Sequence, residues 1–91
     1  MKAQASLLIM GRVQGVFFRA NAQQIARKFS IKGWVRNLED GNLEILAEGE
    51  EENLQSFINW CHKGPKGAIV KKVDISWREY DGKFTDFNIL F

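Results

Sequence analysis

The fold is decided by the stretch 34-WVRNLEDGNLEILAE-48. At its centre lies Asp40-Gly41, a pair that favours a tight turn between two antiparallel strands. Residues 34–38 are expected to form the first of these strands, and Gly33 interrupts the pattern just before them. The second strand places Leu43, Ile45 and Ala47 on one face and Asn42, Glu44 and Glu48 on the other, with Leu46 as the exception. We therefore predict a β-hairpin with one face in the core and the other in solvent.

Helical periodicity flanks this hairpin on both sides. The i, i+3, i+4, i+7 spacing of one helix face is kept before it by Ala22, Ile25, Ala26 and Phe29, and after it by Leu54, Phe57, Ile58 and Cys61. Three acidic residues, Glu50, Glu51 and Glu52, precede the later run and suit the start of a helix. The sequence therefore predicts one helix from Arg19 onward and another that ends near residues 63–67.

Three further strands lie outside the helices. Ala5, Leu7 and Ile9 alternate with their neighbours, as do Val73, Ile75 and Trp77, and finally Phe87, Ile89 and Phe91. We expect a turn at Asp81-Gly82 between the last two of these strands. The pairing partner of the last strand stays open.

The resulting element order is β-α-β-β-α-β with an extra strand at the C-terminal end. This order predicts an α+β fold of the ferredoxin-like, split β-α-β type, an antiparallel sheet with two helices on one face. Right-handed crossovers make the first two strands parallel and give the strand order fourth, first, third, second. A chain of 91 residues is too short for two independent cores, so a single domain over residues 1–91 is expected.

The composition excludes several classes of protein. Hydrophobic residues make up 45% and charged residues 26%, as in soluble globular domains. The longest apolar run near the N-terminus, residues 7–10, is too short for a signal peptide or a membrane span. A single cysteine, Cys61, cannot form an internal disulfide and favours the cytoplasm. The net charge of +2 with interspersed signs argues against a nucleic-acid partner.

Residues suited to bind an anion meet at one edge of this predicted sheet. The loop of residues 12–18 follows the first strand, and its Gly15 permits a backbone bend that turns successive N–H groups inward. Arg19 opens the helix that follows and adds a planar, permanently charged fork to the positive helix end. Asn37 ends the second strand at the same edge. The sequence therefore predicts an oxyanion site, with phosphate as its natural guest.

Two motifs carry a family resemblance. The segments 11-GRVQGVFFR-19 and 33-GWVRN-37, the latter continuing through Gly41 to Gly49, resemble the two signatures of the acylphosphatase family, in the right order and separation. One departure is Leu43, where the family usually has valine, and this apolar exchange should have little effect. The resemblance covers the whole chain in length and element order.

This resemblance implies hydrolysis of the carboxyl-phosphate bond of acyl phosphates, with no metal, no cofactor and no phosphoenzyme. Arg19 then binds the phosphoryl group together with the backbone N–H groups of the loop, and Asn37 orients the attacking water. The loop residues concerned are Gln14, Gly15, Val16, Phe17 and Phe18. Which of their side chains pack inward is left open. Inorganic phosphate is expected as product and competitive inhibitor, and nothing demands more than a monomer.

The chemistry supports these roles independently. A carboxylate leaving group has a pKa of about 4, so it departs without a strong general acid. Phosphoryl transfer then depends mainly on positioning and on charge stabilisation. A neutral amide at position 37 orients water without repelling a dianionic substrate, which a carboxylate there would do.

Other functions are weighed against this one. The same element order hosts RNA-binding modules, but the outward positions Asn42, Glu44 and Glu48 lack the aromatic and basic residues such modules need. A small-ligand regulatory domain is a further alternative, as is an acylphosphatase-like domain of a larger carbamoyl-handling enzyme, although the span from Met1 to Phe91 favours a free-standing protein. Carbamoyl phosphate and 1,3-bisphosphoglycerate are substrates that the family suggests, without a choice between them.

Four residues are left out of the predicted site. Arg12 and Arg36 are expected to be exposed charges. Cys61 is assigned to the core and His62 to the surface. Adjacent helix residues point about 100° apart, so the two side chains do not form a joint catalytic or metal site. No second histidine or cysteine completes a zinc site.

Overall fold

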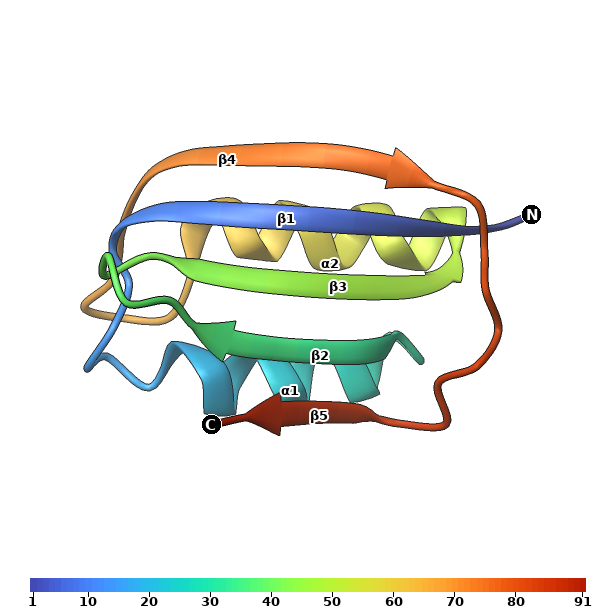
Figure 1. The fold of residues 1–91 in the computed structure, drawn as a ribbon, viewed down its shortest axis with the longest axis horizontal. Helices are drawn as coiled ribbons and strands as arrows, with labels where there is room; N and C mark the ends of the chain where they lie inside the picture. The colour runs from blue at the N-terminus through green and yellow to red at the C-terminus, as the bar shows by residue number, and fades with distance from the viewer.

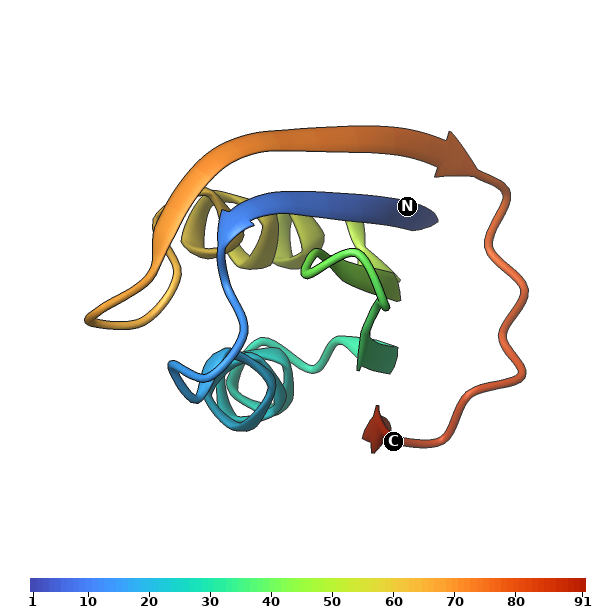
Figure 2. The same cartoon turned by 60° about the vertical axis from the view of Figure 1, so that its left-hand side comes forward.

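The computed structural model describes residues 1–91 as seven elements. They are β1 (Lys2–Arg12), α1 (Phe18–Lys28), β2 (Lys32–Asn37), β3 (Leu43–Glu50), α2 (Glu51–Lys63), β4 (Ile69–Arg78) and β5 (Phe87–Leu90). The strands form one sheet in the order β4-β1-β3-β2-β5, and both helices lie on the same side of it (Figures 1 and 2). Neither helix has the length and apolar character needed to cross a membrane.

The predicted strand order is confirmed for the first four strands. Both β1 and β2 pair antiparallel with β3, so they run in the same direction and end at the same edge of the sheet. In Figure 1 this edge is on the left, where the loop before α1 and the end of β2 meet. The two parts of the site predicted from sequence, the phosphate-binding loop and Asn37, therefore lie at one end of the molecule.

The last strand pairs in parallel with β2, with Gly33 opposite Phe87 and Arg36 opposite Leu90. The sheet is thus mixed, and the prediction of an antiparallel sheet is wrong for this pair. The reason is the path of residues 79–86, which cross from one sheet edge to the other (Figure 1). Because β4 ends where β2 begins, a strand that starts on that side must run in the direction of β2.

The core lies between the sheet and the two helices. In α2 the predicted apolar face is confirmed, since Leu54, Phe57, Ile58 and Cys61 are all buried. In α1 the buried residues include two alanines, Ala22 and Ala26, whose small side chains allow close approach to β2 and β5. Burial raises the pKa of the Cys61 thiol far above its usual range, so this side chain is a protonated, apolar part of the core.

Glu48 lies on the sheet face away from the helices, yet it is only 1% exposed. Its carboxylate accepts hydrogen bonds from Gln4 Nε2 at 3.1 Å, the Asp81 N–H at 3.2 Å and the Gly82 N–H at 3.1 Å. The expectation of a solvent-exposed Glu48 is therefore wrong, because the crossing segment covers it. Asp81 and Gly82 correspondingly belong to this crossing and not to a tight turn.

Gly33 lies inside β2 and does not interrupt it. A Cβ at this position would lie 1.9 Å from the carbonyl oxygen of Leu46, so the close approach of β2 to β3 requires glycine here.

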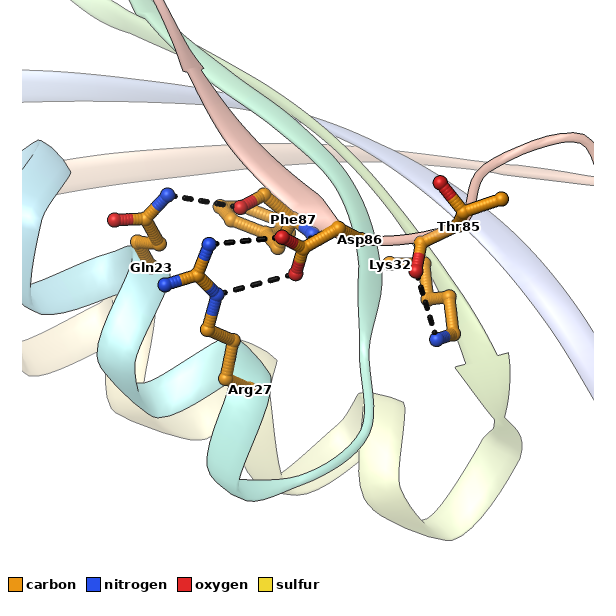
Figure 3. A network of polar contacts seen from close by, with 6 residues as sticks. All are labelled: Gln23, Arg27, Lys32, Thr85, Asp86 and Phe87. Carbon is orange, nitrogen blue, oxygen red and sulfur yellow. Dashed lines mark hydrogen bonds and ion pairs between the residues drawn. The ribbon is translucent and has the colours of Figure 1, made fainter.

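Polar contacts attach β5 to α1 and to β2 (Figure 3). Arg27 holds Asp86 with two hydrogen bonds, Nε to Oδ1 at 3.1 Å and Nη2 to Oδ2 at 2.8 Å, and these bonds lower the pKa of Asp86. Gln23 Nε2 donates to the Phe87 carbonyl at 2.9 Å, and Lys32 Nζ to the Thr85 carbonyl at 3.1 Å. These contacts fix the start of β5, which then runs toward the edge where β1 and β2 end.

Candidate active site

The loop between β1 and α1 contains two residues in the left-handed backbone region. Gly15 has φ 75° and Phe17 has φ 60°. A Cβ at Gly15 would meet no atom within 4 Å, so glycine serves the backbone angle here and not a tight fit. At Phe17 the same region costs a residue with a side chain roughly 1–3 kcal/mol. Such a strained conformation persists only where the surrounding fold holds it in place. Residues of this kind are concentrated at functional sites.

The N–H groups of this loop have no partners within the protein. None of the N–H groups of Gln14, Gly15, Val16, Phe17 and Phe18 donates a hydrogen bond to another protein atom. Helix α1 also begins without a side-chain cap and without an acidic residue in its first turn. In contrast, α2 carries Glu51 and Glu52 in its first turn. The start of α1 therefore keeps several donors and about half a positive charge available for an anion.

Arg19 lies in the first turn of α1 and is half-buried. Its guanidinium carbon is 5.1 Å from the centre of the Phe91 ring, a cation–π arrangement, and it forms no ion pair with any carboxylate. A cation at the positive end of a helix is unfavourable by about 0.3–1 kcal/mol unless an anion is bound there. The charge of Arg19 therefore adds to that of the helix end.

Asn37 ends β2, opposite Leu43 of β3. The residue is half-buried, and its Oδ1 atom is buried without a hydrogen-bond partner in the protein. Leaving such an acceptor unpaired costs about 1–3 kcal/mol, and native structures contain few of them. Asn37 Oδ1 is thus an unpaired acceptor enclosed at the end of β2.

Gln14 connects the loop to the hairpin next to Asn37. Its Nε2 donates to the Leu38 carbonyl at 2.7 Å and to the Asn42 carbonyl at 3.0 Å. Leu38 directly follows Asn37, so this side chain ties the two predicted halves of the site together. From the sequence, Gln14 was predicted to contribute only its backbone N–H group to phosphate binding. The role of its side chain was not predictable, because no residue spacing indicates which hairpin carbonyls lie near a distant loop.

An open pocket of about 460 Å³ lies over the start of α1. It is lined by Gly15, Phe17, Arg19, Ala20, Ile89 and Phe91. Asn37 is not among the lining residues. Ile89 and Phe91 were not predicted as site residues, because the pairing partner of the last strand was unknown. The pairing of β5 with β2 brings Ile89 to the pocket, and Phe91 directly follows β5.

The remaining candidates are sorted by burial. Phe18 is 2% exposed and its ring packs edge-on against Trp60 at 5.3 Å, whereas Phe17 is 77% exposed. Val16 is half-buried against the core.

Arg36 pairs with Glu44, with Nε 2.7 Å from Oε1, so its charge is already compensated. No group of three or more His, Cys, Asp or Glu side chains is arranged to hold a metal ion.

Comparisons with known proteins agree with the two motifs. The family model described as Acylphosphatase matches residues 5–89. An acylphosphatase from Roseiflexus sp. (strain RS-1) is 46% identical over 89 residues, which cover 98% of this chain and 96% of that protein. One from Syntrophus aciditrophicus (strain SB) is 42% identical over 91 residues, covering 100% and 95%. The crystal structure of acylphosphatase from Bacillus subtilis superposes with a TM-score of 0.94 at 37% identity and covers 100% of both chains. The chain is therefore a member of the acylphosphatase family of enzymes.

Proposed function

We propose that this protein hydrolyses the carboxyl-phosphate bond of acyl phosphates, releasing a carboxylate and inorganic phosphate. Membership of the acylphosphatase family supports this activity. The observation that carries the proposal is the row of five unpaired N–H groups at residues 14–18, directly before Arg19. Such a row beside a fixed positive charge suits the oxygens of a phosphoryl group.

Binding of the phosphoryl group falls to the loop and Arg19. The loop N–H groups donate hydrogen bonds to phosphoryl oxygens, and the guanidinium of Arg19 donates to two oxygens with its planar fork. The negative charge on these oxygens persists in the transition state, where preorganised donors stabilise it without reorganisation. The cation–π contact with the Phe91 ring favours the observed placement of this guanidinium.

Asn37 orients the attacking water. Its carboxamide, whose Oδ1 has no partner in the protein, turns toward that water and accepts a hydrogen bond from it, which fixes the direction of attack without adding negative charge. The water oxygen forms a bond to phosphorus while the bond between phosphorus and the acyl oxygen breaks. The carboxylate leaves with that electron pair, and the protons of the water pass to phosphate and solvent.

The proposal extends to the form of the enzyme. All groups assigned to the site come from one chain, which is consistent with a monomer. The loop N–H groups and Arg19 supply the positive charge that a metal ion provides in other phosphoryl-transfer enzymes, so we assign no metal or cofactor a role. The free, buried thiol of Cys61 suits the cytoplasm.

A hydrolysis assay with benzoyl phosphate tests this function. We expect purified protein to release inorganic phosphate and benzoate at an undiminished rate in the presence of a chelator, with inorganic phosphate as competitive inhibitor. Activity that appears only after a metal is added would contradict the mechanism. A protein without activity under either condition would contradict the function.

Gln14→Ala is expected to lower kcat about ten- to a hundredfold. The loop loses its two hydrogen bonds to the hairpin carbonyls, and small displacements between bound phosphoryl group and water have effects of this size. Steady-state kinetics measure the change, and denaturant unfolding measures stability. The matched control is Gln23→Ala, which also loses a glutamine-to-carbonyl bond but outside the loop. Equal kcat in the two variants would show that Gln14 has only a structural role.

A further inference from the structure

Two apolar side chains beside Arg19 are exposed to solvent and not buried in the core. Phe17 is 77% exposed and Phe91 is fully exposed. With Ile89 and Ala20 they line the pocket in which Arg19 is the one charged residue. Its volume of about 460 Å³ falls within the roughly 300–1,000 Å³ typical of small-molecule sites. A phosphoryl group on the loop fills only part of such a space.

The position of Phe17 is set by the loop. Two phenylalanines stand side by side in the chain, and the ring of Phe18 fills the core while that of Phe17 projects over the pocket. The backbone of Phe17 is held in the left-handed region to achieve this. An aromatic ring exposed to water does not stabilise the fold. Its placement on a strained backbone therefore indicates that a ligand covers the ring.

The other wall of the pocket comes from β5. Alternation along a strand places residues 87, 89 and 91 on one face. Phe87 is fully buried and packs against Phe57 at 5.6 Å, Ile89 is half-buried, and Phe91 is exposed beside Arg19. This apolar row therefore runs from the core toward the site, with Ile89 inside β5 and Phe91 directly after its last residue.

We propose that Phe17, Ile89 and Phe91 form an apolar platform that binds the acyl group of the substrate and selects acyl phosphates with an aromatic or large aliphatic acyl group. The inference rests on the proposed function, because the phosphoryl group on the loop anchors the acyl group beside it. Apart from Arg19, the pocket offers no polar side chain. A carbamoyl group or a second phosphate would therefore find no specific partner on this wall.

The kcat/KM ratio of benzoyl phosphate to acetyl phosphate tests the platform. Both substrates share the phosphoryl end, so the ratio cancels any change in the loop itself. We expect the wild type to favour benzoyl phosphate. Phe17→Ala and Phe91→Ala should each reduce the ratio about five- to tenfold, as expected for loss of one aromatic contact, and Phe91→Leu should retain most of it. The control is Trp77→Ala, an exposed ring on the distant strand β4. An unchanged ratio in both phenylalanine variants, or an equal fall in Trp77→Ala, would overturn the platform.

A binding measurement separates this inference from the proposed function. Titration calorimetry with phenylphosphonate and methylphosphonate needs no turnover, and we expect the wild type to prefer the phenyl compound and Phe17→Ala to lose that preference. Acyl phosphate hydrolysis without a phenyl preference overturns the platform alone. A phenyl preference without hydrolysis of any acyl phosphate supports the platform and contradicts the function. Self-association that Phe17→Ala abolishes, with an unchanged substrate ratio, would assign the exposed rings to contact between copies and overturn the platform.

Discussion

Asn37→Ala is expected to lower kcat by about a hundred- to a thousandfold while inorganic phosphate still binds. The variant removes the carboxamide that we propose orients the attacking water, and removal of one preorganised polar group at a reaction centre has effects of this size. Ground-state binding depends on the loop N–H groups and Arg19, which the variant retains. Turnover measured with benzoyl phosphate, together with the inhibition constant of phosphate, separates the two effects.

The stability of the Asn37→Ala variant separates a catalytic role of Asn37 from a structural one. Because Oδ1 has no partner in the protein, its removal breaks no hydrogen bond and relieves a desolvation penalty. We therefore expect the free energy of unfolding to stay level or to rise. Asn88→Ala, at an exposed asparagine of β5, is the control and should keep wild-type kcat. A normal kcat with lost phosphate binding in Asn37→Ala would contradict the role of Asn37.

Arg19→Ala is expected to lose phosphate affinity and rate together. A charge-assisted, two-pronged contact at a preorganised site contributes roughly 2–4 kcal/mol, which corresponds to about a 30- to 900-fold loss in kcat/KM. Arg19→Lys keeps the charge without the planar fork, so it should recover only part of this loss. Kinetics and phosphate inhibition are the measurements.

Arg12→Ala serves as the control for Arg19, since Arg12 is exposed at the end of β1. It removes one positive charge near the loop without removing the guanidinium at the helix start. An Arg19→Ala enzyme with unchanged kinetics and unchanged phosphate inhibition would refute the assignment. A loss of equal size in Arg12→Ala would assign the effect to net charge.

Much of the fold follows from local patterns. The hairpin around Asp40-Gly41, the apolar faces of both helices and the order of the first four strands are all visible in the spacing of residues. The direction of β5 and the burial of Glu48 are not, because both depend on the path of residues 79–86. The Gly82 N–H group reaches Glu48 across 34 positions of sequence, and no local pattern encodes such a contact.

The site divides in the same way. Gly15, Arg19 and Asn37 stand out in the sequence because they lie in motifs, and the topology brings the ends of β1 and β2, which carry these segments, to one edge. No local sequence pattern encodes the side-chain link made by Gln14, the unpaired Oδ1 of Asn37 or the apolar wall of Ile89 and Phe91. Each of these depends on contacts between segments that lie far apart along the chain.

If the loop binds phosphate as we propose, the uncapped start of α1 also couples folding to phosphate concentration. Free N–H groups and a cation at a positive helix end weaken the empty native state, while an unfolded chain offers phosphate no comparable site. By mass action, phosphate at a hundred times its dissociation constant would raise the free energy of unfolding by about 2.7 kcal/mol. On the proposed function, the product that competes with substrate for the loop would therefore also protect the enzyme from unfolding.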